Sequence, residues 1–166
     1  MASQWYSLVS QKLFLASTLL DVAAQTAITG SSAPPQKLQQ EAATQGSIEL
    51  LLRAKRLLLV MIAKFYQKRP NGPLSLAELA SLIGDEASEI ELLTALERDS
   101  GSWWSHIEQL ETAQNSPPAT RKTVSSENII AVSTELGPDR SAQALRRTLK
   151  AMKQFTDNLE AQHGEW

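Results

Sequence analysis

The sequence contains no cysteine and only two histidines, His106 and His163. Without cysteine there is no disulfide, no thiolate nucleophile and no cysteine-based zinc or iron–sulfur site. Glu160 and His163 have the Glu-x-x-His spacing of di-iron helix bundles, but the second such pair that these sites need is absent. A glycine-rich phosphate loop, a nucleophile elbow and a His-Glu-x-x-His motif are also missing. We therefore predict no metal, no cofactor and no enzymatic activity.

Neither sign of charge dominates the chain, and no stretch alternates polar and apolar residues as a half-buried strand does. There are 16 lysines and arginines against 18 aspartates and glutamates, and 42% of the residues are hydrophobic. A general nucleic-acid binder is usually clearly basic, so we predict no nucleic-acid partner. A chain of 166 residues suits one domain, and we predict a single helical domain over residues 1–166.

The most apolar stretch, residues 46–68, predicts a central helix around which the rest of the chain packs. It holds seven consecutive apolar residues, 57–63, and its polar residues fall on one narrow arc of a helical wheel. A membrane span needs roughly 20 mostly apolar residues, and four cations interrupt this stretch: Arg53, Lys55, Arg56 and Lys64. We therefore predict no membrane span. A glutamine-rich lead-in begins at Gln36, and Gly46 marks either a kink in one long helix or a new start capped by Ser47.

Residues 3–28 carry apolar side chains at three- and four-residue steps, which predicts the first helix. Its opposite face is polar but almost uncharged and consists of Ser7, Ser10, Gln11, Thr18 and Gln25. Such a face suits either solvent or a second protein chain. The segment loosely resembles a signal peptide, but Asp21 interrupts its apolar part. We therefore predict a helix of a cytoplasmic protein.

Capping signals predict three short helices after the turn at residues 69–73. Ser75 with Glu78 and Ser88 with Glu91 match the capping box, in which each side chain binds the other residue's backbone N–H. Ser102 is placed to cap a third helix, which runs from residue 103 to about residue 113.

The remaining third of the chain predicts a loop and one more helix. A loose loop is expected over residues 114–138, with the apolar residues 128–132 packed onto the core. The last helix is expected over residues 139–162, with one narrow apolar stripe. Together these elements predict an all-α fold, an irregular up-and-down bundle around the helix at residues 46–68.

Charge is distributed unevenly between two segments. Residues 85–111 contain eight acidic residues against Arg98, and residues 138–155 contain five basic residues against Asp139. Opposite net charges favour a fold in which the last helix lies near the acidic segment and each compensates the other. The alternative is a basic face on the last helix that meets an anionic partner; its residues are Arg146, Arg147, Lys150 and Lys153.

Two lysines occur where the helical pattern calls for apolar residues. Lys55 lies in the middle of the broad apolar face of the central helix, and Lys12 lies in the stripe of the first helix. A buried ammonium needs a partner, for which Asp21, Glu97 and Glu135 are candidates. Each lysine is therefore either a paired or snorkelling structural residue, or a cation that holds an anionic ligand.

The dipeptide Trp103-Trp104 is the most unusual in the chain. Adjacent residues on a helix diverge by about 100°, so we expect one indole in the core and the other in a shallow interface with the loop. The alternative is that one of the two is an exposed anchor for a protein partner, because tryptophan is enriched at binding hot spots.

Several short stretches resemble an uncharacterised family of small helical proteins found chiefly in pseudomonad-type bacteria. The resemblance covers nearly the whole chain, and these are the stretches that carry it: Trp5-Tyr6, residues 11–16, residues 75–80, Ser102-Trp103, residues 127–132 and Glu165-Trp166. It implies a bacterial protein that stands alone, and it transfers neither an activity nor a functional residue.

Two functional hypotheses follow from these patterns. The first is a non-enzymatic helical interaction or scaffold protein, a homo-oligomer or the partner of another protein, which associates through the uncharged face of the first helix. The second is a helical bundle that binds a small anionic molecule through Lys12 or Lys55.

Overall fold

The computed structural model describes residues 3–28, 34–117 and 137–164. Within these residues the chain forms helices and no strands, which confirms the predicted all-α fold. The helices in chain order are α1 (Gln4–Ile28), α2 (Pro34–Phe65), α3 (Leu76–Ile83), α4 (Ser88–Arg98), α5 (Trp103–Gln114) and α6 (Ala142–His163). The predicted packing of residues 128–132 lies outside the described residues.

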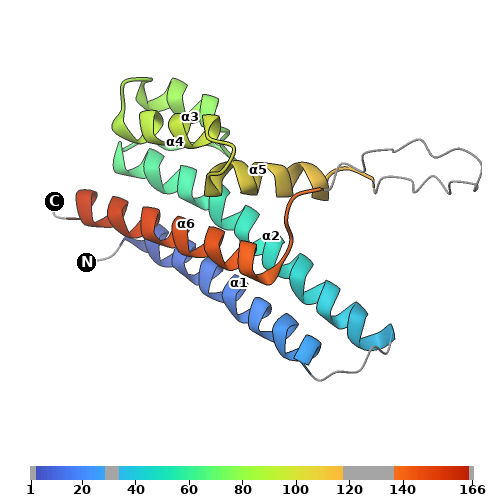
Figure 1. Cartoon of the computed structure of the whole chain (residues 1–166). Helices are drawn as coiled ribbons and strands as arrows, with labels where there is room; N and C mark the ends of the chain where they lie inside the picture. The colour runs from blue at the N-terminus through green and yellow to red at the C-terminus, as the bar shows by residue number, and fades with distance from the viewer. Residues whose placement is uncertain (1–2, 29–33, 118–136, 165–166) are drawn as a thin grey trace, which may run out of the picture.

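Helix α2 is the centre of the bundle, with the other helices on two sides of it (Figure 1). Helix α1 runs antiparallel along α2, and α6 lies beside α1. The short helices α3, α4 and α5 gather over the C-terminal half of α2, where α5 contacts both α2 and α6. Because helices cover α2 from both sides, six of the seven residues 57–63 are buried.

Gly46 is neither a helix start nor a helix end, because α2 runs through it from Pro34 to Phe65. A Cβ atom at this glycine would lie 2.9 Å from Cδ1 of Leu19 on α1. The neighbouring hydroxyl of Ser47 is buried and donates a hydrogen bond of 2.9 Å to the carbonyl oxygen of Ala16. The Gly46-Ser47 pair therefore marks the close approach of α1 and α2.

Helix α2 ends at Phe65, three residues before the predicted boundary at Lys68. Gln67 has a positive φ of 57°, and its N–H donates to the carbonyl of Lys64. The N–H of Lys68 reaches back to the carbonyl of Ala63 at 2.9 Å. This pair of bonds is the Schellman motif, which here closes the helix before Pro70 can do so.

Two of the three predicted serine caps are confirmed. Ser75 and Glu78 form the complete capping box, and Ser102 is the N-cap of α5, with a hydroxyl that accepts from the backbone N–H of Ser105 at 3.1 Å. The predicted box at Ser88 is wrong: Ser88 is the first helical residue, and the N-cap is Ala87 without a side-chain cap. The hydroxyl of Ser88 donates instead to the carboxylate of Glu89.

The last helix begins at Ala142, three residues later than predicted, with Ser141 as its N-cap. The carboxylate of Asp139 accepts a hydrogen bond of 2.9 Å from the backbone N–H of Ser141. This short local bond forms a turn just ahead of the helix and postpones its start.

Candidate functional site

Lys55 projects from the middle of α2 into an ion-paired cluster beside α5. Its side chain is only 8% exposed, and its Nζ atom pairs with Glu108 and, at 3.1 Å, with Glu111. The ammonium also lies 4.8 Å from the ring centroid of Trp104, a cation–π distance. Lys55 is thus a buried cation with carboxylate partners, which is one of the two arrangements considered for this lysine from the sequence.

The carboxylates that hold Lys55 differ from the three proposed from the sequence. Asp21 pairs with Arg146 at 2.8 Å, Glu97 forms no ion pair within the described residues, and Glu135 lies outside them. The spacing of Glu108 and Glu111 on α5 places both carboxylates on the helix face that meets α2.

A cleft of about 490 Å³ opens beside this cluster, between α2, α3 and α5. Four carboxylates and two cations line it: Glu78, Glu97, Glu108, Glu111, Lys55 and Arg56. Burial raises the pKa of Glu111, but hydrogen bonds from Arg56 and Lys55 outweigh it and hold that pKa below its usual value. The cleft is therefore acidic, and an anionic ligand at Lys55 would have to displace carboxylates already bound there.

Lys12, the second predicted lysine, has no carboxylate partner within the described residues. It is half-buried, and its Nζ atom donates to the side-chain oxygen of Gln11 at 3.4 Å. Lys12 and Lys55 lie in different environments, so the structure does not bring the two candidates into one site.

The two tryptophans divide between the core and a half-buried position. Trp104 is buried, and its Nε1 atom has no hydrogen-bond partner among the described groups. Trp103 packs edge-on against Trp104, with ring centroids 5.7 Å apart, and at 5.4 Å against Phe155 of α6. Trp103 therefore joins α5 to α6.

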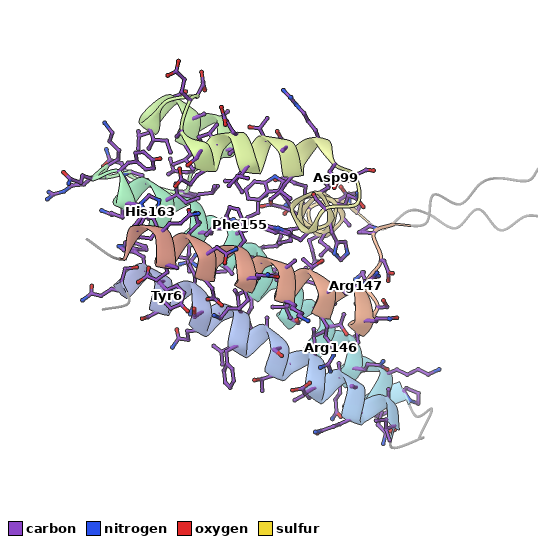
Figure 2. The ribbon with its side chains drawn as sticks, turned by 60° about the vertical axis from the view of Figure 1, so that its left-hand side comes forward. Tyr6, Asp99, Arg146, Arg147, Phe155 and His163 are labelled. Carbon is purple, nitrogen blue, oxygen red and sulfur yellow. The ribbon has the colours of Figure 1, made fainter. Side chains whose placement is uncertain are left out.

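The four basic residues predicted to form one face of α6 do not share a face. Figure 2 shows Arg146 on the side of α6 toward α1 and Arg147 on the side toward α5. Lys150 and Lys153 line the same groove as Arg146, whereas Arg147 lines a different cleft beside α5. Arg146 pairs with Asp21, and Lys153 pairs with Asp157 of its own helix. Arg146 and Lys153 are thus compensated by α1 and by α6 itself and not by the acidic segment, which corrects that part of the expectation, although α6 does pack against α5 of this segment as expected.

A groove of about 400 Å³ lies between α1 and α6 on the surface of the bundle. Its apolar floor consists of Leu13 and Leu149, and Phe14 of α1 stands at its edge with 72% of its surface exposed. Along the α6 edge lie Arg146, Lys150 and Lys153, and none of the described residues that line the groove carries a carboxylate. Lys150 has neither an ion pair nor a hydrogen bond within the described residues.

The side of α1 that points away from the bundle is exposed and uncharged. We call this side the α1 outer face, and it comprises Ser7, Gln11, Leu15, Thr18, Val22 and Gln25. Leu15 and Val22 are 40% and 44% exposed. Ser10, which the sequence placed on this face, is instead half-buried on the groove side. The exposed leucine and valine were not predicted, because the apolar stripe was assigned wholly to the core.

The two histidines form structural contacts that the sequence did not reveal. His163 contacts the buried carboxylate of Glu89 at 2.6 Å, and Tyr66 donates to the same carboxylate at 2.6 Å. Burial opposes ionisation of Glu89, but these hydrogen bonds hold its pKa below the usual value. Burial, aided by the neighbouring Glu89, raises the pKa of Tyr66 to about 12.

His106 links α5 to the start of α6. Its Nε2 atom lies 2.8 Å from the carbonyl oxygen of Asp139 and its Nδ1 atom 2.6 Å from the hydroxyl of Thr148. A carbonyl only accepts, so Nε2 carries the proton, and in the neutral ring Nδ1 accepts from the threonine. Both ring nitrogens therefore have partners.

Two further properties bear on function. In the described part of the chain, no group of three or more acidic or histidine side chains is placed to hold a metal ion. By length and composition alone, helix α1 is long and apolar enough to cross a membrane, although part of it is buried in the bundle. A core helix and a signal sequence meet the same criteria, so the predicted absence of a membrane span and the predicted cytoplasmic location stay predictions.

The fold and these sites define a small all-α bundle protein built around one long helix. Over residues 1–166 the chain matches the model of a family described as "Family of unknown function (DUF6586)", and it belongs to that family. This confirms the resemblance to an uncharacterised helical family, while the implied bacterial source stays a prediction. No curated protein and no solved structure matches the chain.

Proposed function

We propose that this protein is a non-enzymatic interaction protein that self-associates through the α1 outer face. One observation carries the proposal: a surface with exposed Leu15 and Val22 and no charge runs along the outside of α1. From Ser7 to Gln25 the face is roughly 27 Å long at 1.5 Å per residue. Apolar surface of this kind, framed by polar residues, is typical of protein–protein contacts.

The absence of charge favours a second copy of the same chain as the partner. In a two-fold symmetric dimer each face meets its own copy, so a face with net charge would repel itself. The charged residues of α1, Lys12 and Asp21, flank the α1 outer face rather than lie on it. Serine, threonine and glutamine side chains can exchange hydrogen bonds around the leucine and valine.

Sedimentation equilibrium over a wide range of protein concentrations tests the proposal. We expect a dimer for the natural chain and a monomer for the double variant Leu15→Glu and Val22→Glu, because two carboxylates on each face would meet those of the partner. Leu92→Glu on α4 is the matched control, since Leu92 is 50% exposed and lies on another surface. A natural chain that stays monomeric, or an equal loss of mass in the control, contradicts the proposal.

A further inference from the structure

The groove between α1 and α6 combines an apolar floor with basic edges. Leu13 and Leu149 form the floor, and the benzyl group of Phe14 extends from its edge into solvent. An exposed phenylalanine beside an open apolar groove leaves hydrophobic surface in water, which a bound apolar chain would cover.

Charge on the groove is positive, and part of it is uncompensated. Arg146, Lys150 and Lys153 stand on one side of α6, at steps of four and three residues. The first is paired with Asp21 and the last with Asp157, whereas Lys150 between them has no partner within the described residues. An anionic head group at Lys150 would therefore gain an ion pair without displacing a carboxylate. This distinguishes the groove from the acidic cleft at Lys55.

The α1 side of the groove adds an unused hydroxyl. Ser10 lines the groove, and its Oγ atom is buried without a hydrogen-bond partner among the described groups. A buried hydroxyl without a partner is costly, and rotation about one side-chain bond would offer it to a ligand oxygen.

From these features we infer that the groove binds a single-chain fatty carboxylate. The alkyl chain lies on Leu13, Leu149 and Phe14, and the carboxylate pairs with the Lys150 ammonium. A cavity of about 400 Å³ is within the usual range for small-molecule sites. This inference goes beyond the proposed self-association and does not depend on it, because Lys150 lies outside the α1 outer face.

Isothermal titration with laurate, below its micelle concentration, tests the inference. We expect one laurate per chain and weaker binding of dodecanol and of dodecyltrimethylammonium, which have neutral and cationic head groups. Lys150→Glu should weaken laurate binding by about tenfold or more, because it replaces an attraction by a repulsion at the same position. Circular dichroism of each variant shows whether the helices remain.

Arg147→Glu is the matched control, because it reverses the charge of a neighbouring residue that faces a different cleft. Equal loss of laurate affinity in the two variants would mean that only the net charge of α6 matters, and the groove site would be rejected. Absence of laurate binding to the natural chain rejects it as well. Binding to phosphatidylglycerol vesicles without binding to monomeric laurate would identify a membrane surface contact instead, and would overturn the inference.

Discussion

Replacing Lys55 by methionine shows how a buried ion pair contributes to this fold. The side chain of Lys55 is 8% exposed, whereas those of Glu108 and Glu111 are 45% and 27% exposed. Removal of the lysine leaves carboxylates that water can reach, and Glu111 keeps its 2.9 Å pair with Arg56. Methionine also fills the space of the lysine stem with apolar atoms. We therefore expect Lys55→Met to change the free energy of unfolding by only about 1 kcal/mol, in either direction.

Removal of the acids is predicted to cost more, because it leaves the ammonium buried. The double variant Glu108→Gln and Glu111→Gln keeps the shape of the site but removes both negative charges from around Lys55. Breaking a buried pair from one side costs about 3–5 kcal/mol, and partial access to water reduces this to roughly 2–3 kcal/mol here. In the Lys55→Met background the same two substitutions should cost little, because no buried charge remains to be stranded.

Urea unfolding of the four proteins in this cycle, followed by circular dichroism, measures these differences. Arg56→Met provides a control with an exposed cation on the same carboxylate, and it should cost below about 1 kcal/mol. A larger loss from Lys55→Met than from the double acid variant would refute the reasoning. It would mean that the attraction between the charges, and not the burial of the ammonium, decides the stability of the site.

Two further predictions concern α2 and the Glu89 cluster. Gly46→Ala should raise stability in urea by up to about 1 kcal/mol, because alanine favours a helix and the flexible end of Leu19 can yield to the new Cβ atom; a loss would show that α1 and α2 cannot separate there. The pKa of Glu89 is lowered from 4.5, so its stabilisation exists above that pH and disappears as the pH falls. Glu89→Gln should therefore destabilise the protein at neutral pH and reduce the loss of melting temperature on acidification; an unchanged acid response would contradict this.

The helices were predictable because their signals are local. The apolar run in α2, the capping box at Ser75 and the cap at Ser102 depend on residues within a few positions of each other, and all three are present. The errors arose where a local capping signal competed with a contact from a distant part of the chain. Ser88 has the spacing of a cap, but the carboxylate beside it, Glu89, is bound by Tyr66, which directly follows α2. Such a contact depends on packing that the local sequence does not encode.

The sequence identified residues of the candidate sites, but it did not identify the side chains that contact them. Lys55 was recognised because a lysine on an apolar face must be paired, yet the choice of Glu108 and Glu111 depends on how α5 crosses α2. The net charges of whole segments agree with the packing of α6 against α5 but do not give the ion pairs, since Arg146 pairs with a single aspartate of α1. Summed charge describes the long-range field, whereas the observed pairs are set by which side chains stand within a few ångströms.

Phe14 lies between the two proposed binding surfaces, the α1 outer face and the groove. A fatty chain in the groove would cover part of this ring, and a second copy on the outer face would approach it from the other side. Shared surface couples two binding events, and linkage requires that each changes the affinity of the other by the same factor. If the ring is held in one orientation by the ligand, the second copy meets a surface already ordered, and the coupling is favourable. If both occupants need the same edge of the ring, the coupling is unfavourable, and the fatty carboxylate would then control whether the chain associates.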